Sequence, residues 1–418
     1  MKSEKIRKVF EDTAYTRMGG SKDELRAARY LQEQCAQMGL NASLEAFPVP
    51  MAEIQEASFW VDGQNIPCRG LLHAGSAELE APLYYLRNED PVSLSQCKGK
   101  IVLLDRYPKY WLYQNLIDHG AVGLVFYEGN VDFEDWEIGQ RELRIHTHMG
   151  RRLPAVNIHA VDAVRLVAER SQTAKLLLKQ QAREGESWNV VLDLPGQTDE
   201  YMVLTAHYDS TSLSHGAYDN MSGCIGLLAI AEHFANVPHR YGLRFVWCGS
   251  EERGLLGSRA YAQSHQAELE KAVLNINLDM IGCIMGYFLC VCTAEECLVD
   301  YLKAFSAEIG MGLKAYQGVY SSDSTPFADL GIPAVSFARI APETVHTVHD
   351  QHDTADIMSI RQMEEDIGVI LEFVRRMATS DLCPIPRTIP DLIRGRLDDY
   401  MGRKRGKGDP LDPVRTWM

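Results

Sequence analysis

HYDSTSLSHGAYDN, residues 207–220, directly follows the apolar run YMVLTA at residues 201–206. The run is typical of a buried strand, so one core strand ends at His207, with Asp209 and Asp219 shortly after it. Imidazole and carboxylate side chains in this position indicate either a polar loop that caps a helix or a metal site. The stretch alone leaves both interpretations open.

Other strand-like runs end in the same way. Glu251 and Glu252 follow LRFVWCGS, Asp279 follows AVLNINL, and the histidine-rich TVHTVHDQHDT comes after PAVSFA and a loop. The carboxyl ends of parallel strands meet at one edge of a sheet, where open α/β folds place their sites. We therefore expect these side chains to converge.

Strands and helices alternate along this part of the chain. The alternation predicts an α/β domain with a mostly parallel central sheet flanked by helices. The expected strands are 189–194, 202–206, 243–248, 273–278 and 333–338. The expected helices are 221–236, 257–268, 295–309 and 360–378, with an earlier one in SKDELRAARYLQEQCAQMGL.

The converging residue types suit zinc, which takes imidazole and carboxylate ligands and keeps a position open for water in catalytic sites. With five ligand positions, one carboxylate could bridge two metals, which together polarise a carbonyl and activate water. One residue of the adjacent pair Glu251–Glu252 could bind metal while the other takes the proton of the water. The structural alternative for this pair is a helix N-terminus, which favours acidic residues.

Composition excludes several other classes of function. The chain has 418 residues and a formal net charge of −15, which argues against nucleic-acid binding and fits a cationic substrate amine. It has neither a long apolar run for a membrane span nor the apolar core of a signal peptide. The 10 scattered cysteines, none in a CxxC pair, predict reduced thiols in a cytoplasmic protein.

Two regions carry weaker signals. His146 and His148 could bind a metal, but such a pair is more typical of a surface turn. The tail after Cys383 is rich in Pro, Gly and Arg, which predicts a segment that is extended, disordered or packed on a partner subunit. A homo-oligomer is therefore kept as an alternative to a monomer.

The motifs HYDS, GAYDNMSG, GSEERGLLGSRAY, NLDMIG, SDSTPFADLGIPAV and HDQHDT resemble, in order and spacing, those of metallopeptidase family 28. Its members are di-zinc exopeptidases of the bacterial leucyl-aminopeptidase type. The resemblance covers 1–48 and 189–380 and implies a discontinuous catalytic domain of the zinc-exopeptidase fold. Residues 50–188 are similar to a protease-associated domain inserted into that family, which implies a smaller β-rich α/β domain. Residues 383–418 are left as a C-terminal extension.

The resemblance also implies roles for single residues. It makes Glu251 the general base and acid, and it has Asp209 hold the ring of His207. It implies a cis peptide bond between Asp219 and Asn220. The zinc ligands that it implies are His207, Asp219 as the bridge, Glu252, Asp279 and one histidine of TVHTVHDQHDT.

Three histidines compete for the last ligand position. HDQHDT fits the family pattern with His349, although Asp350 stands where the family usually has Thr. His346 is the alternative, and His352 is the third candidate. The resemblance favours His349.

Substrate contacts are predicted around SSDSTPF. Tyr320 and Ser322 are candidate donors to the scissile carbonyl, and Asp323 is a candidate substrate contact. Relatives often carry a histidine where this chain has Ser324, which puts the contacts around Asp323 in doubt.

The resemblance implies a metal-dependent exopeptidase, most simply an aminopeptidase with two zinc ions that acts on peptides with a free N-terminus. A carboxypeptidase or dipeptidase of the same fold is the first alternative and would need a cation at the site, such as Arg253 or Arg339. A non-catalytic binding protein is the second, and it predicts a loss of ligands that the sequence does not show.

Overall fold

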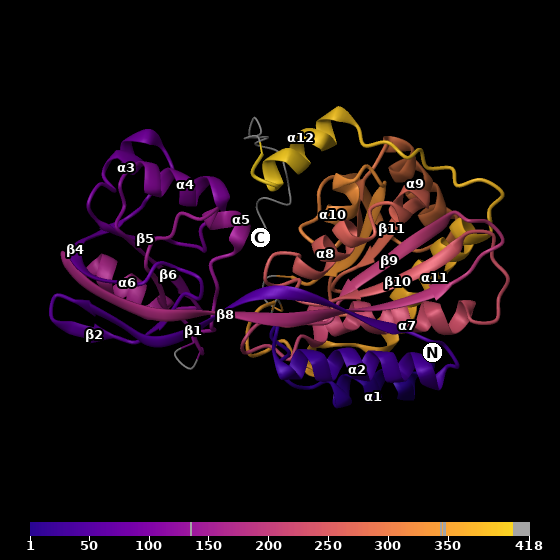
Figure 1. The fold of residues 1–418 in the computed structure, drawn as a ribbon, viewed down its shortest axis with the longest axis horizontal. Helices are drawn as coiled ribbons and strands as arrows, with labels where there is room; N and C mark the ends of the chain where they lie inside the picture. Colours follow the sequence, from indigo (N-terminus) through magenta and orange to yellow (C-terminus); the bar gives the residue numbers. More distant parts are fainter. Residues whose placement is uncertain (134–135, 343–344, 346–347, 404–418) are drawn as a thin grey trace.

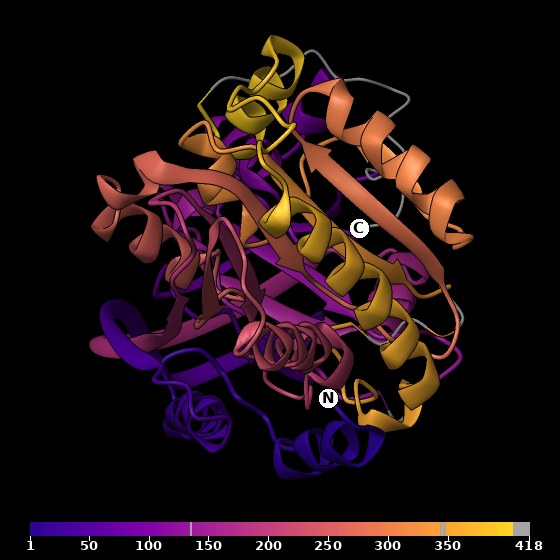
Figure 2. The same cartoon turned by 90° about the vertical axis from the view of Figure 1, so that its right-hand side faces the viewer.

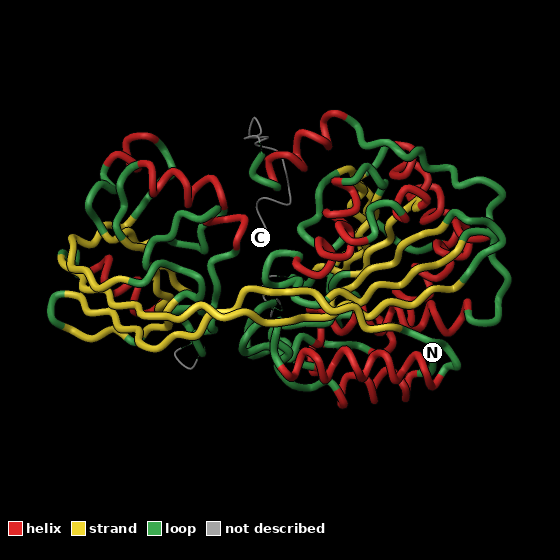
Figure 3. The backbone as a smooth tube through the Cα atoms, in the orientation of Figure 1, coloured by secondary structure: helices red, strands yellow, loops and turns green. Residues whose placement is uncertain are grey.

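The computed structural model describes residues 1–133, 136–342, 345 and 348–403. A large lobe and a small lobe are joined by two long strands, β1 (Ser43–Val61) and β8 (Thr173–Leu194) (Figure 1). The two strands pair antiparallel from Ser43 opposite Val191 to Val61 opposite Ala174. Both run without a break from one lobe into the other (Figure 3).

The predicted domain boundaries fall inside these two strands. At its first end, β1 packs Leu44 against the core of the large lobe, and at its other end Phe59 and Val61 are buried in the core of the small lobe. The large-lobe core takes its buried residues from 6–42 and 190–385, whereas the small-lobe core takes them from 59–178. Two separate cores support the inserted domain, which we keep as a proposal.

The sheet of the large lobe has the strand order β13-β12-β14-β11-β9-β10-β8, and β1 pairs with the outer side of β8. The central strands β14, β11, β9 and β10 are parallel, while β12 pairs antiparallel with β14 and β8 with β10. The remaining bounds are β9 Tyr201–His207, β10 Gly242–Cys248, β11 Ala272–Leu278, β12 Tyr287–Thr293, β13 Lys314–Gln317 and β14 Ala334–Ile340. The predicted strands are confirmed to within two residues, except that β8 begins far earlier.

Helices cover both faces of this sheet (Figure 2). Alternation along β9 sends Met202 and Leu204 into one helical layer and Val203 into the other. The first layer contains α1 Ser3–Asp12, α2 Lys22–Gln37, α7 Ser222–Phe234, α9 Glu296–Ile309 and α11 Ile360–Thr379. The second contains α8 Leu256–Ser264 and α10 Ser324–Asp329. Short helical turns lie at η1 Ala217–Met221, η2 Glu268–Lys271 and η3 Ala355–Ile357.

The small lobe is a second α/β unit. Its strands β4, β5, β6 and β7 are parallel to one another, β3 pairs antiparallel with β7, and β2 pairs antiparallel with β1. The strand bounds are β2 Gln64–Ile66, β3 Cys68–Gly70, β4 Ala77–Tyr85, β5 Ile101–Leu103, β6 Gly123–Glu128 and β7 Ala155–His159. The helix bounds are α3 Pro91–Ser95, α4 Tyr110–Asp118, α5 Ile145–His148 and α6 Ala160–Ala168.

The C-terminal extension corrects one expectation. It forms a helix, α12 (Asp391–Tyr400), whose Ile393 and Leu397 are fully buried against the same chain. Arg403 forms an ion pair with Asp329 at 2.6 Å. The prediction of an extended or disordered tail is therefore wrong for 391–403, because its few apolar side chains pack on the large lobe. Residues 404–418 lie outside the described part.

Within the described residues, no helix is long and apolar enough to cross a membrane.

Candidate metal centre

The predicted ligands gather at the carboxyl edge of the parallel strands. His207 is the last residue of β9, and Asp279 follows the last residue of β11. In the parallel register of β9 and β10, His207 lies opposite Cys248, which places Glu251 and Glu252 just beyond the same edge. The convergence expected from the strand ends is what the geometry shows.

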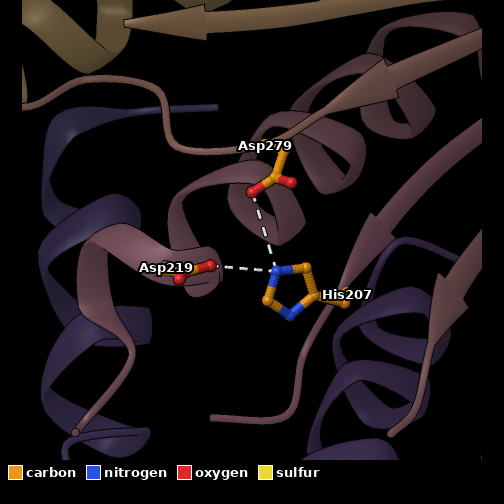
Figure 4. A group of neighbouring side chains, drawn as sticks. All are labelled: His207, Asp219 and Asp279. Carbon is orange, nitrogen blue, oxygen red and sulfur yellow. Dashed lines mark ion pairs between the residues drawn. The ribbon is translucent and has the colours of Figure 1, made fainter. Parts of the chain in front are cut away.

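The first group of donors surrounds His207. Its Nε2 lies 3.0 Å from Oδ1 of Asp219 and 3.6 Å from Oδ1 of Asp279 (Figure 4). All three side chains are buried. One nitrogen and two carboxylate oxygens thus point at a common centre from three different segments.

The second group contains Asp219 again. Its other oxygen, Oδ2, lies 3.2 Å from Nε2 of His349, and that nitrogen lies 3.1 Å from Oε2 of Glu252. Within each group, the donor atoms lie within 4.8 Å of one another. Asp219 is therefore shared by two potential cation positions.

Asp209 organises the loop between these groups. Its Oδ1 accepts a hydrogen bond of 2.9 Å from the backbone nitrogen of Glu251, and its Oδ2 accepts one of 3.2 Å from that of Glu252. Oδ1 also lies 3.5 Å from Nδ1 of His207. The fully buried Asp209 thus faces the histidine ring and the glutamate pair together.

Residues that the sequence reasoning missed hold Asp219 in place. Asp353 accepts hydrogen bonds from the backbone nitrogens of Tyr218, at 2.7 Å, and Asp219, at 3.1 Å. Asn220, joined to Asp219 by the expected cis peptide bond, donates to the carbonyl of Leu278 at 2.9 Å. The motif HDQHDT contains Asp353, but this motif was taken to predict only the last histidine ligand.

A buried arginine also supports the loop that runs from Tyr208 to Gly216. Arg17, which is 0% exposed, donates from Nε to the carbonyl of Tyr208 at 2.7 Å and from Nη2 to that of Gly216 at 3.0 Å. No local pattern marks Arg17, because the carbonyls that tie it to this loop lie 191 and 199 residues away in the sequence.

The electrostatics of the centre are those of crowded acids and histidines. Burial, together with the charge of Glu252, holds the pKa of Glu251 well above its usual range. Burial would lower the pKa of His349, but Glu252 and Asp219 raise it to about 10. The acidic side chains thus need positive charge close by.

The donor set fits divalent cations. Among the described residues, Oδ1 of Asp279 and Oε1 of Glu252 are buried without a hydrogen-bond partner. Buried polar atoms are normally paired, so unpaired donors in one cluster indicate a missing ligand. Two imidazoles and three carboxylates are the ligand types that zinc takes.

Other predicted residues lie elsewhere. His352 pairs with Asp350, its ring centroid lies 5.2 Å from that of Trp136 with the rings tilted by 59°, and it belongs to neither donor group. His148 is buried in the small lobe and accepts a hydrogen bond from the backbone nitrogen of Gly150. His346 and the side chain of His146 lie outside the described residues.

The three predicted substrate contacts are all buried. Ser322 and Asp323 are 0% exposed, and Oγ of Ser322 accepts a hydrogen bond of 2.9 Å from Asn277. Tyr320 is 3% exposed, and its hydroxyl has no hydrogen-bond partner among the described residues. Its pKa is raised well above its usual range by burial and by the nearby charge of Asp279. Tyr320 is therefore the contact that we retain.

Comparison with known proteins agrees with this geometry. The family described as Peptidase family M28 matches residues 189–371. These residues belong to peptidase family M28. The M28 domain contains every residue of both donor groups, as well as Glu251 and Asp209. The small lobe and α12 lie outside it.

Similar proteins cover most of the chain. Aminopeptidase YwaD of Bacillus subtilis is 25% identical over 350 residues, which are 78% of this chain and 73% of that relative. The solved aminopeptidase from Aneurinibacillus sp. strain AM-1 has a TM-score of 0.75 at 22% identity and covers 92% of this chain and 96% of its own. BSAP, a zinc aminopeptidase from Bacillus subtilis, has a TM-score of 0.75 at 24% identity, with 94% and 98% covered. These structural likenesses establish the α/β fold of the chain, both lobes included.

Proposed function

We propose that this chain is a metal-dependent aminopeptidase that holds two zinc ions and removes N-terminal residues from peptides with a free amine. The observation that carries the proposal is the position of Asp219, whose two oxygens face the two donor groups. The names of the similar proteins, aminopeptidase YwaD and the zinc aminopeptidase BSAP, support the same activity and metal.

The donors divide between two zinc positions. His207 and Asp279 would hold one ion, His349 and Glu252 would hold the other, and Asp219 would bridge them. When bound, such a pair lowers the pKa of water and polarises a carbonyl. Asp209 would fix the tautomer and orientation of the His207 ring.

Glu251 supplies the proton transfer. It takes a proton from the attacking water as the new C–O bond forms at the scissile carbonyl. It then passes that proton to the leaving amine as the C–N bond breaks. Burial and neighbouring charge raise the pKa of Glu251, which suits a group that must both accept and return a proton.

Tyr320 is the proposed donor to the carbonyl oxygen as negative charge develops on it. Its buried hydroxyl has no hydrogen-bond partner in the described structure, and the charge of Asp279 helps to raise its pKa. The free amine of the substrate would lie among the carboxylates, so we expect the enzyme to require an unblocked N-terminus.

Cytoplasmic location stays a proposal, supported by the ten cysteines, all of which are free. A homo-oligomer also stays a proposal. The described part of the tail does not require one, because it packs on its own chain.

The test is hydrolysis of one peptide with a free or an acetylated N-terminus, followed by mass spectrometry with and without a chelator. We expect stepwise loss of single residues from the free peptide only, abolished by chelation and restored by zinc. Glu251→Gln should lower kcat by about 10²–10⁴-fold while zinc content stays unchanged. Cleavage of the acetylated peptide, or activity after full chelation, would contradict the proposal.

A further inference from the structure

A cation from outside the M28 domain faces the proposed metal centre. Arg144 belongs to the small lobe, and its Nη2 lies 3.9 Å from Oε2 of Glu252. Its side chain is 31% exposed, and its guanidinium donates no hydrogen bond to any residue that the structure describes. A guanidinium presents five N–H donors in a fork that matches a carboxylate. Those donors are available to a ligand.

The backbone of Arg144 is held in register with the catalytic loop. Its nitrogen donates to Oη of Tyr107 at 3.1 Å, and that hydroxyl donates to the carbonyl of Glu142 at 2.9 Å. The carboxylate of Glu142 accepts a hydrogen bond of 2.8 Å from Nε of Arg253, which directly follows Glu252 in the chain. The small lobe therefore presents Arg144 at a defined place beside Glu252, a proposed metal ligand.

A second group reaches the same place from α12. The hydroxyl of Tyr400 shares a hydrogen bond of 2.8 Å with Oγ of Ser321 in the M28 domain. The neighbouring Asp399 accepts a hydrogen bond of 2.7 Å from Nε1 of Trp111 in the small lobe. Figure 1 shows α12 above the space between the lobes. The helix thus contacts both lobes and carries Tyr400 toward the centre.

Charge links these groups. Burial lowers the pKa of Arg144, but the charges of Glu251, Tyr107, Glu252 and Tyr400 raise it above its usual range. A guanidinium with unpaired N–H donors beside the proposed metal centre favours an anionic group on the substrate.

The two arginines considered from the sequence are already engaged. Arg253 donates to Glu142 and to Nε2 of His73, at 3.1 Å. Arg339 forms two hydrogen bonds to Asp366, at 2.6 and 2.8 Å. Of these three arginines, only Arg144 donates no hydrogen bond from its guanidinium to a residue that the structure describes.

We propose that Arg144, with Tyr400 beside it, binds a substrate carboxylate on the leaving-group side of the scissile bond. This inference rests on the proposed function, because it assumes a substrate whose amine lies at the metal centre. In a dipeptide, the C-terminal carboxylate comes one residue after the scissile bond. The whole extended dipeptide spans about 7 Å. The shared chemistry is a carboxylate, either the C-terminal one of a dipeptide or the side chain of an acidic second residue.

The test compares Leu-Leu with Leu-Leu-amide, and Leu-Asp-amide with Leu-Asn-amide. If Arg144 binds the C-terminal carboxylate, kcat/KM of the wild type should favour Leu-Leu over its amide by about 10-fold or more. If Arg144 binds an acidic side chain instead, kcat/KM should be higher for Leu-Asp-amide than for Leu-Asn-amide. Arg144→Gln should bring the ratio of the two kcat/KM values close to one, and Tyr400→Phe should reduce it by a smaller factor.

Two controls keep the inference separate from the proposed function. Arg106→Gln removes an exposed arginine of the same lobe, paired with Glu89, and should keep the wild-type ratios. Calorimetric binding to Glu251→Gln gives a readout without turnover. Leu-Leu should bind to this variant more tightly than Leu-Leu-amide does. In the double variant Glu251→Gln, Arg144→Gln, the two affinities should be equal. Cleavage of all four substrates at equal rates, or ratios unchanged in Arg144→Gln, would overturn the inference and leave the aminopeptidase proposal standing. If no substrate is cut, the proposed function itself fails.

Discussion

The side chain of Asp209 accepts a hydrogen bond of 2.9 Å from the backbone nitrogen of Glu251. The same oxygen faces the His207 ring at 3.5 Å. A single buried carboxylate therefore orients a proposed zinc ligand and the proposed general base, although it belongs to neither donor group.

Asp209→Asn should weaken zinc binding and lower turnover together. An amide cannot accept hydrogen bonds on both of its ends, so the loop of Glu251 and Glu252 loses one anchor. We expect a loss of about 10–100-fold in zinc affinity, measured by competition with a chromogenic chelator. Asp199→Asn, at an exposed ion pair with Lys271, is the control and should bind zinc like the wild type. Equal zinc affinities in the wild type and both variants would contradict the proposed role of Asp209.

His349→Ala should remove one of two bound zinc ions, whereas His352→Ala should keep both. Only His349 of these two lies in a donor group, while His352 pairs with Asp350 and is more than half exposed. Metal content by mass spectrometry after dialysis distinguishes the two variants. A loss of zinc in His352→Ala alone would move the ligand to that residue.

Asp323→Asn should stabilise the metal-free protein more at pH 8 than at pH 5. Burial raises the pKa of Asp323 to about 7, against about 3.9 in an unfolded chain. The folded chain therefore holds this proton more tightly, and the stability from the protonated carboxyl is lost as the pH rises through about 7. The asparagine has no proton to lose. The Tm of the variant minus that of the wild type should rise by about 2 °C or more between the two pH values. A difference that does not change with pH would contradict the burial argument.

Leu397→Ala should cost about 2–5 kcal/mol in the free energy of unfolding if α12 packs as described, because Leu397 is fully buried. Leu392→Ala in the same helix is the matched control, since Leu392 is 68% exposed. Chemical denaturation measures both changes. Two equally stable variants would mean that α12 is not docked in solution.

The sequence predicted the elements that carry a continuous apolar run or an apolar face at helical spacing. The expected strand 202–206 is β9, and the expected helix 360–378 is α11, because each carries an apolar face. The full length of the strands β1 and β8 was not predicted, since their middle residues are largely exposed and give no hydrophobic pattern. α12 was missed because it has few apolar residues and is held partly by charged pairs.

The candidate ligands were predictable because each directly follows a core strand or lies in a motif. Arg144 was not, since nothing near it in the sequence marks it and its position depends on how the small lobe packs against Arg253. Asp353 was quoted in a motif, but its bonds to the backbone before Asp219 appear only in three dimensions.

The central claim is that Asp219 bridges two zinc ions. Anomalous diffraction above and below the zinc edge, from crystals grown with zinc, tests it most directly. We expect two peaks on either side of the Asp219 carboxylate, about 3.5–4 Å apart, one beside His207 and Asp279 and the other beside His349 and Glu252. A single peak, or two peaks that do not share Asp219, would contradict the account.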